Sequence, residues 1–200
     1  MKKIYIPLRI YYLIKRIMDI FLSLIGIVIS SPIILIIGIA VKTESSGSFF
    51  YCQKRVGLHR KEFTLYKMRS MYTSFAKLPP QWTDKNDYRI TKVGKFIRKK
   101  RIDELPQLIN ILKGDMSLVG PRPEQPYFVE KFNKTIPNFK DRLKVKCGLT
   151  GWAQVNGGYD LTPEEKLELD LYYIDNQCLW LDINIIFKTI IIVLTGRGAR

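Results

Sequence analysis

The stretch TKVGKFIRKKRIDELPQLINILKGDMSLVGPRPE, residues 91 to 124, organises the rest of the chain. It opens with a cationic run that contains no acid, made of Lys92, Lys95, Arg98, Lys99, Lys100 and Arg101. Two adjacent carboxylates, Asp103 and Glu104, then begin an apolar pattern at helical spacing, which predicts a helix ending at Lys113-Gly114. The following turn, Gly120-Pro121-Arg122-Pro123, is stiff and presents one guanidinium. A carboxylate pair at a helix N-terminus, with cations on both sides, suits a site that handles phosphate.

The carboxylate pair also has an ordinary interpretation. Acidic side chains are common in the first turn of a helix, where each stabilises the helix by about 0.3–1 kcal/mol. On the pair alone, a plain helix start is the better interpretation of Asp103 and Glu104. The choice between the two interpretations therefore depends on the rest of the chain.

The composition narrows the class of partner. The chain has 200 residues, which suits one domain, and its formal net charge is +15. Such a charge favours nucleic acid, an anionic membrane face or phosphorylated small molecules as partners. The three cysteines show no CxxC spacing, which is typical of a reducing compartment. With one histidine and no Cys/His cluster, a zinc site is not expected, whereas an ion bound by oxygen ligands stays open.

An apolar segment from Ile17 to Val41 precedes the charged part of the chain and is long enough to span a bilayer. Pro32 removes a helical hydrogen bond, and serine hydroxyls can satisfy the freed carbonyl, so we expect a helix–break–helix at Ser31-Pro32. Both flanks of the segment are basic, and a single crossing cannot place both in the cytoplasm. The sequence therefore predicts a re-entrant segment rather than a span or a cleavable signal peptide. Ser31 has two equally good interpretations, a hydroxyl that takes part in substrate binding at the helix break or one that only caps the helix.

The chain after this segment shows mixed patterns. Short β-like runs at Phe49–Cys52 and Glu62–Tyr66 flank a turn near Gly57 and predict a basic hairpin. Residues 78–87 lack periodicity and are predicted to form a polar loop. Further on, residues 127–132 predict a short helix that starts at Pro126.

Three features mark the last third of the chain. The basic run Phe139–Lys146 is interpreted as strand-like, and the glycine-rich Cys147–Gly158 as a loop that closely approaches a ligand. Thr162-Pro163-Glu164-Glu165 is a capping box that starts a helix carrying Asp170. Asp170 is interpreted either as a surface acid or as a residue that holds an active-site cation or arginine. Ile183 to Leu194 is too short to span a bilayer and predicts an amphipathic helix at the membrane interface.

From Arg101 to Glu124, RIDELPQLINILKGDMSLVGPRPE resembles the motif of the bacterial sugar transferases, the monotopic phosphoglycosyl transferases. The resemblance runs from the apolar N-terminal segment to about Leu194. It implies a location at the cytoplasmic face of the bacterial inner membrane, with the helix break at Ser31-Pro32 near the polyprenyl phosphate. Relatives often carry an extra N-terminal membrane domain, so the chain is expected to be a minimal catalytic form.

The resemblance also implies a reaction, the transfer of a sugar 1-phosphate from a UDP-sugar to undecaprenyl phosphate with release of UMP. Asp103 matches the nucleophile, which would form a phosphosugar–aspartyl intermediate, and Glu104 matches its partner in proton handling. Mg²⁺ is expected between Asp103 and the diphosphate. The expected substrate-binding residues are Lys67, Arg98, Arg122 and Asp170. Glu124 after Pro-Arg-Pro resembles the starters of exopolysaccharide or O-antigen, which favours a UDP-hexose or UDP-N-acetylhexosamine donor such as UDP-galactose or UDP-glucose.

Together these features predict an α+β, mostly helical fold. Residues 1–42 are expected to form a basic flank and a re-entrant membrane helix, and residues 43–200 a catalytic domain that ends in an interfacial helix. One alternative is a non-catalytic membrane scaffold of glycan assembly, which would keep its function after Asp103→Asn. A nucleic-acid-binding protein is disfavoured, because no such module is recognisable and the apolar segment would have no use. The sequence leaves a homodimer open.

Overall fold

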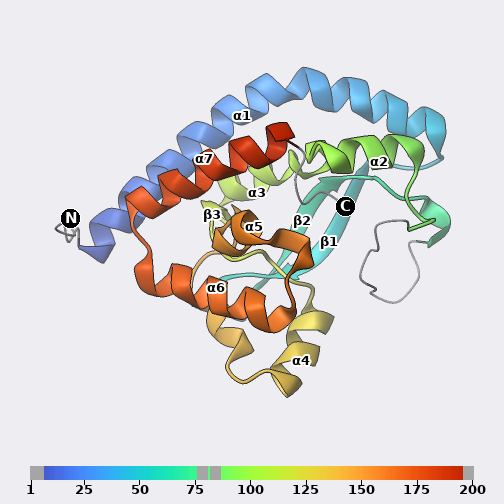
Figure 1. Cartoon of the computed structure of the whole chain (residues 1–200). Coiled ribbons are helices and arrows are strands. Elements are labelled where there is room, and N and C mark those ends of the chain that lie inside the picture. Colours follow the sequence, from blue (N-terminus) through green and yellow to red (C-terminus); the bar gives the residue numbers. More distant parts are fainter. Residues whose placement is uncertain (1–6, 76–80, 82–86, 196–200) are drawn as a thin grey trace.

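The computed structural model of the chain describes residues 7–75, 81 and 87–195, and the fold it shows is mostly helical (Figure 1). The helices are α1 (Leu8–Glu44), α2 (Lys92–Lys99), α3 (Gln107–Lys113), α4 (Pro126–Thr135), α5 (Trp152–Asn156), α6 (Pro163–Asn176) and α7 (Leu179–Thr195). The strands are β1 (Phe50–Val56), β2 (Glu62–Met68), β3 (Ser117–Val119) and β4 (Gly148–Thr150). Five short 3₁₀ turns in the described residues connect them, at Leu58–Arg60, Thr73–Phe75, Ile102–Glu104, Phe139–Lys144 and Gly158–Asp160. The predicted α+β, mostly helical class is confirmed, whereas most of the predicted loop at residues 78–87 lies outside the described residues.

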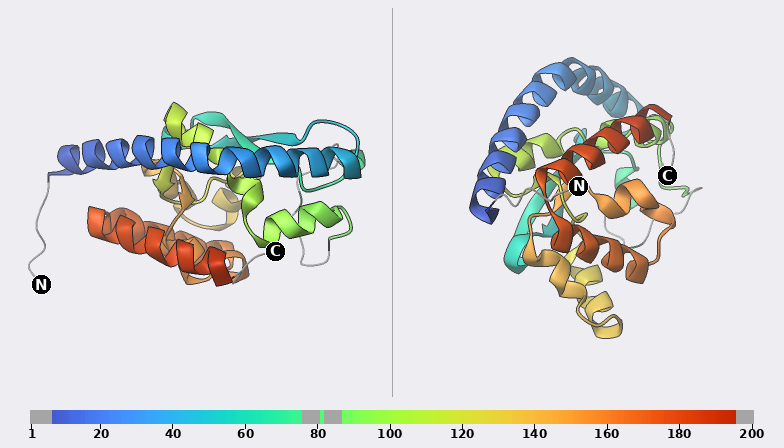
Figure 2. Two further views of the ribbon diagram at one scale, coloured as in Figure 1. Left: turned by 90° about the horizontal axis from the view of Figure 1, so that it is seen from above. Right: turned by 60° about the vertical axis from the view of Figure 1, so that its left-hand side comes forward.

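Helix α1 is one continuous helix that passes through Pro32 without interruption. The predicted break is therefore wrong as an interruption of the helix. Figure 1 shows α1 as an arch over the rest of the molecule, whereas Figure 2 shows it straight from above, so its curvature lies in one plane. The Ser31 hydroxyl donates to the Val28 carbonyl at 2.9 Å. That carbonyl is the one that Pro32 leaves without a donor, so the expected rescue by serine is confirmed and keeps the helix intact.

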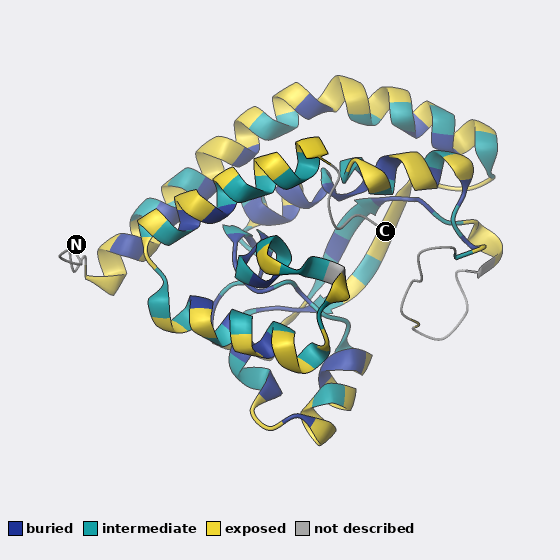
Figure 3. Cartoon of the chain, in the orientation of Figure 1, coloured by how far each residue is buried: buried dark blue, intermediate teal, exposed yellow. Residues whose placement is uncertain are grey.

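The outer face of α1 is apolar and exposed, while its inner face is buried against the rest of the chain (Figure 3). Among the described residues, α1 is the one helix that is long and apolar enough to cross a membrane. Polar side chains fix its inner face. The Asp19 carboxylate accepts the Leu118 backbone N–H at 2.9 Å and the Ser117 hydroxyl at 3.1 Å. Arg16 donates to the carbonyls of Ile111 and Leu112, which lie in the last turn of α3.

Strands β1 and β2 form the predicted hairpin, antiparallel, with Phe50 opposite Met68. Strand β2 packs on α3, and Ile111 of α3 and Met116, which follows the helix, are fully buried in one cluster with Leu65. A buried amide locks this contact. Asn110 of α3 accepts the Tyr66 backbone N–H at 3.0 Å and donates to the Thr64 carbonyl at 2.7 Å.

The second sheet is a short parallel pair, in which Ser117 of β3 lies opposite Gly148 of β4. The backbones approach so closely here that a Cβ on Gly148 would lie 2.1 Å from the Gly120 nitrogen. The prediction of a ligand-binding loop at residues 147–158 is therefore corrected in part. The segment contains β4 and α5, and the glycine at 148 accommodates the chain's own backbone.

The C-terminal third is helical. The predicted strand-like run at residues 139–146 is wrong, because Phe139–Lys144 forms 3₁₀ turns. A strand there would expose Phe139 on one face or the other, whereas in the turn it is 1% exposed in the core between α4 and α6. The capping box of α6 is confirmed, with Thr162 at the N-cap and Glu165 at N3. Helix α7 is longer than predicted and begins at Leu179, ahead of the apolar run.

Candidate active site

A sharp turn of the chain places the two carboxylates. Thr91 caps α2 by accepting the Gly94 N–H at 2.8 Å, and the helix ends at Lys99. Arg101 then adopts a left-handed conformation, with φ of 53°, which reverses the chain into the 3₁₀ turn that contains Asp103 and Glu104. The pair therefore lies in the turn before α3 rather than in the first turn of that helix, which corrects the predicted helix start.

The end of α3 follows the prediction. Pro106 is the N-cap residue of α3, and Gly114 ends the helix with φ of 90°. Gly114 therefore has the role that the sequence pattern gave it, whereas Pro106 lies just before the helix.

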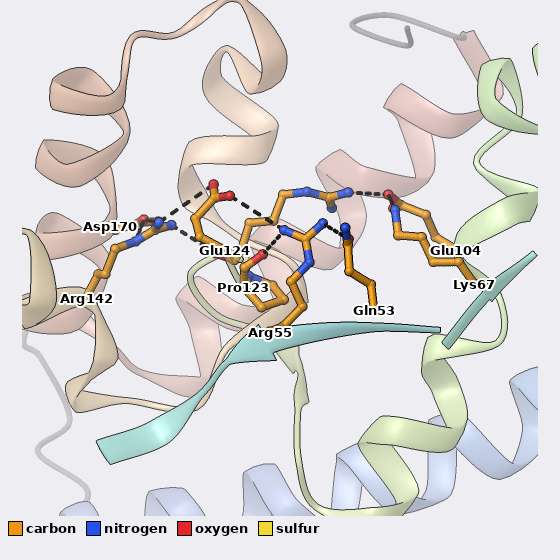
Figure 4. Close-up of polar contacts among 9 residues, drawn as sticks. Gln53, Arg55, Lys67, Glu104, Pro123, Glu124, Arg142 and Asp170 are labelled. Carbon is orange, nitrogen blue, oxygen red and sulfur yellow. Dashed lines mark hydrogen bonds and ion pairs between the residues drawn. The ribbon is translucent and has the colours of Figure 1, made fainter. Parts of the chain in front are cut away.

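Cations from three parts of the chain converge on the carboxylates. Lys67 of β2 places its Nζ 3.2 Å from Glu104 Oε1 (Figure 4). The same Nζ lies 3.9 Å from Asp103 Oδ2. The Arg122 guanidinium, from the turn after β3, donates through Nη2 to Glu104 Oε1. Arg101 Nη1 lies 3.8 Å from Glu104 Oε2. The predicted residues Lys67, Asp103, Glu104 and Arg122 are thus brought together in one site, and Arg101 joins them.

The two carboxylates have opposite electrostatics although both are buried, with 7% of Asp103 and 6% of Glu104 exposed. Burial raises the pKa of Asp103, and the nearby Lys67 only partly offsets that effect. Burial also opposes ionisation of Glu104, but Arg122, Lys67 and Arg101 together outweigh it and hold its pKa below the ordinary range. Neighbouring acids whose pKa values are pushed apart are typical of sites where each acid has its own role.

The carboxylates in the described part of the chain do not form a complete metal cage. No group of three or more His, Cys, Asp or Glu side chains there has the arrangement of a metal site. Mg²⁺ usually takes one or two protein carboxylates and completes its shell with water and substrate phosphates. Asp103 is the acid that suits this use, because Glu104 is already engaged by three cations. The donor set therefore fits a cation shared with a bound diphosphate.

Of the remaining predicted residues, Arg98 acts on the pair through its charge, whereas Ser31, Pro32 and Asp170 lie in other parts of the fold. Arg98 of α2 lies 3.5 Å from the Ser70 hydroxyl through Nη1, and its charge acts on Asp103 by favouring the ionised form. Ser31 and Pro32 lie within α1, where the serine hydroxyl bonds its own helix. Asp170 is 1% exposed and faces an arginine, as one of the two interpretations of its sequence position proposed.

That arginine, Arg142, was not singled out from the sequence. Its Nε and Nη2 atoms donate to Asp170 Oδ2 at 2.9 and 2.6 Å, and its Nη1 lies 3.8 Å from Glu124 Oε1 (Figure 4). Arg55 Nη1 lies 3.6 Å from Glu124 Oε2. The signal for Arg142 is weak, because it is one cation in a basic run that the sequence pattern assigned to a strand. Its importance comes from contacts with residues far away in the sequence.

The chain is similar to known proteins over nearly its whole length. The model of the family described as "Bacterial sugar transferase" matches residues 10–196. The chain is 48% identical over 198 residues to the UDP-N-acetylgalactosamine-undecaprenyl-phosphate N-acetylgalactosaminephosphotransferase of Aeromonas hydrophila, covering 98% of this chain and 47% of that protein. It is 40% identical over 192 residues to the UDP-glucose:undecaprenyl-phosphate glucose-1-phosphate transferase of Escherichia coli (strain K12), covering 94% and 41% of the two chains. The chain thus spans less than half the length of each of these relatives.

Proposed function

The chain belongs to the bacterial sugar transferase family, and from this premise we propose that it transfers a sugar 1-phosphate from a UDP-sugar to undecaprenyl phosphate and releases UMP. The observation that carries the proposal is the buried pair Asp103 and Glu104, in which one acid is engaged by three cations and its neighbour is not. A site in which cations outweigh burial at one acid but not at its neighbour suits a reaction between an anionic nucleophile and an anionic diphosphate.

In the first step, an Asp103 carboxylate oxygen attacks the β-phosphorus of the UDP-sugar. A bond forms between that oxygen and phosphorus, and the bond from phosphorus to the bridging oxygen breaks, so that UMP leaves with the electron pair. The product is a phosphosugar–aspartyl intermediate. In the second step, an oxygen of undecaprenyl phosphate attacks the same phosphorus and Asp103 leaves as a carboxylate. Burial of Asp103 favours the attack, because a desolvated carboxylate is a stronger nucleophile than a hydrated one.

The cations around Glu104 serve the diphosphate. Arg122 and Lys67 pair with Glu104 in the structure, and a bound diphosphate offers them a more highly charged partner. As they move toward the phosphates, Glu104 loses the charges that hold its pKa low and becomes a better proton acceptor. Glu104 would then take a proton from undecaprenyl phosphate as that phosphate attacks. Asp103, together with the diphosphate, would hold Mg²⁺, which would supply further neutralisation of charge.

The long apolar helix α1 supports a reaction at the membrane surface. One substrate is soluble and the other is a lipid phosphate, whose head group lies at the surface of the bilayer. Helix α1 presents an exposed apolar face that suits a lipid environment, while its inner face carries the site-bearing elements. We place the protein at the cytoplasmic face of the inner membrane, where nucleotide sugars are available.

The order in which sugar donors should be tested comes from sequence similarity to relatives rather than from the geometry of the site. The Aeromonas relative, named for N-acetylgalactosamine, is 48% identical, whereas the Escherichia relative, named for glucose, is 40% identical. UDP-N-acetylgalactosamine is therefore the first donor to test, ahead of UDP-glucose and UDP-galactose.

The test is UMP release by detergent-purified protein supplied with Mg²⁺, undecaprenyl phosphate and each UDP-sugar in turn. We expect release with one donor and its loss, by at least about 10³-fold, in Asp103→Asn, because the covalent route is then closed. With the donor alone, intact mass spectrometry should show a sugar-phosphate adduct on the wild type and on Glu104→Gln but none on Asp103→Asn. UMP release that survives in Asp103→Asn would contradict the covalent mechanism, and silence with all donors would favour a scaffold.

A further inference from the structure

Hydrogen bonds to its carbonyls fix the backbone of the turn that carries Arg122. The four consecutive carbonyls of residues 121–124 each accept a hydrogen bond from a donor outside the turn. Their donors are the Gly148 backbone N–H at 2.9 Å, Arg142 Nη2 at 3.0 Å, Arg55 Nη1 at 3.0 Å and the Val56 backbone N–H at 3.0 Å, in that order. Two of the four donors are side chains, and both are arginines.

These donors control the rotation that the prolines leave free. Pro121 and Pro123 fix their own φ angles, which leaves rotation about the φ and ψ of Arg122, with ψ kept in the extended range by the proline that follows. A hydrogen bond to the Arg122 carbonyl fixes the plane of the peptide that follows Arg122 and hence its ψ. Arg142 therefore helps to set the direction in which the Arg122 guanidinium leaves the backbone toward Glu104.

Arg142 is held in place more firmly than packing requires. Its side chain is 3% exposed and that of Asp170 is 1% exposed, so this ion pair lies almost wholly out of water. Such a pair gives little net stability over apolar residues of similar volume, because both charges lose their hydration. Glu124, from the same turn, faces both Arg142 and Arg55 (Figure 4). The geometry of the pair, rather than its contribution to stability, explains why two charges are buried here.

We propose that Arg142, held by Asp170, is a positioning residue that fixes the Pro121–Glu124 turn and so aims Arg122 at the carboxylate pair and the donor diphosphate. The inference rests on the proposed function, because it assigns Arg142 a role in that reaction. It also gives Asp170 a role without substrate contact, which agrees with its burial. Arg142 acts through Arg122, not on the reacting atoms.

The test compares Arg142→Lys with Lys144→Gln. Lysine keeps a positive charge for Asp170 but lacks the fork that reaches both Asp170 and the Arg122 carbonyl. Lys144 is the matched control, since it lies in the same 3₁₀ segment with a side chain 63% exposed and an ion pair to Asp141. If Arg142→Lys does not fold, the double variant Arg142→Gln, Asp170→Asn is used in its place. This double variant removes both buried charges together.

The first measurement is hydrogen exchange and does not depend on activity. Amides in the peptide covering residues 117–125 should exchange faster in Arg142→Lys than in the wild type and in Lys144→Gln, while α4 keeps its protection. Unchanged exchange in this peptide would overturn the proposal. If exchange is faster in Arg142→Lys but the wild type releases no UMP from any donor, the role of Arg142 in fixing the turn stands. That result would reject the proposed function instead.

The second measurement is a double-mutant cycle on UMP release. Arg142→Lys should lower kcat by roughly 100-fold with a smaller change in KM, the size expected for misplacement of a catalytic group. In an Arg122→Ala background the same change should cost less than about threefold, because residues that act through one another are not additive. A purely structural role predicts equal losses in both backgrounds, and that result would overturn the proposal.

Discussion

At the scale of single residues, nearby cations outweigh the cost of burial at Glu104 but not at its neighbour Asp103. Both side chains are desolvated to a similar extent, so solvent exposure does not distinguish them. The balance between desolvation and the attraction of nearby charges does, because it lowers the pKa of Glu104 and leaves that of Asp103 raised. In the absence of substrate, nearby cations therefore stabilise the negative charge of Glu104 well and that of Asp103 poorly.

Amide variants of the two acids should therefore change stability in opposite directions. Glu104→Gln leaves three cations around a neutral group and should lower the free energy of unfolding by about 3–5 kcal/mol at neutral pH. Asp103→Asn removes a charge whose burial is poorly compensated and should raise the melting temperature. Thermal unfolding in detergent measures both. Equal shifts of one sign would contradict the assignment.

The pH dependence of the Glu104 effect has a definite sign. The pKa of Glu104 lies below its ordinary value of 4.5, so its stabilising contribution is complete above that pH and is lost as the pH falls through the folded-state pKa. The difference in melting temperature between wild type and Glu104→Gln should therefore be full at pH 7 and narrow below about pH 4.5. A difference that stays constant down to pH 3 would contradict the three-cation arrangement.

At the scale of elements, α1 shows how one hydroxyl keeps a proline inside a helix. Pro32 offers no N–H to the Val28 carbonyl, and the Ser31 hydroxyl takes that place at 2.9 Å. The adjacent Ser30 hydroxyl lies 3.5 Å from the Ile27 carbonyl, too long for a strong hydrogen bond. Ser31 is therefore a repair within the helix, and Ser30 provides a matched control for it.

Substitution of Ser31 should matter only when residue 32 is proline. Ser31→Ala should lower the free energy of unfolding in detergent by about 1 kcal/mol, the usual net value of one hydrogen bond. With Pro32→Ala the backbone N–H returns, and Ser31→Ala should then have little effect. Ser30→Ala should be near neutral in both backgrounds. A loss of the same size in both backgrounds would show that Ser31 acts through some other contact.

At the scale of the whole molecule, both ends of α1 bind the same folded unit. Near its start, Lys15 donates to the buried Asp182 of α7 at 2.7 Å. At its end, Glu44 accepts the backbone N–H groups of Lys92 and Val93, and Arg69 donates to the Val41 carbonyl. A helix of this length measures about 56 Å, more than the hydrocarbon core of a bilayer. A straight crossing would pull the two attachments to opposite sides, so the geometry favours re-entry.

Labelling of the two ends of α1 tests this topology. Arg9→Cys and Ser46→Cys, each in a Cys52→Ser, Cys178→Ser background, should both be protected from an impermeant maleimide in intact cells. Both should be labelled in inverted membrane vesicles, because re-entry leaves both ends in the cytoplasm. In a separate Cys178→Ser variant, native Cys52, which is exposed, marks the side on which the catalytic domain lies. Labelling of one end in intact cells would demonstrate a crossing helix and contradict re-entry.

Local pattern was enough to predict the carboxylate pair, the β1–β2 hairpin, the capping box of α6 and the end of α3 at Gly114. Each depends on residues a few positions apart, whose spacing already states which hydrogen bonds they can make. The same applies to the serine repair of α1. The continuity of α1 through Pro32 was not predicted, because a proline indicates a lost hydrogen bond but not how far the helix bends.

Only the tertiary structure decided which charges act together. Arg142, Asp170 and Arg122 are far apart in the sequence, and nothing in their local pattern says that a buried pair fixes the carbonyl of the third. The different surroundings of Asp103 and Glu104 likewise come from Lys67 and Arg122 on separate strands and turns. Electrostatic energy depends on distance and burial, and both are set by how elements pack rather than by their order along the chain.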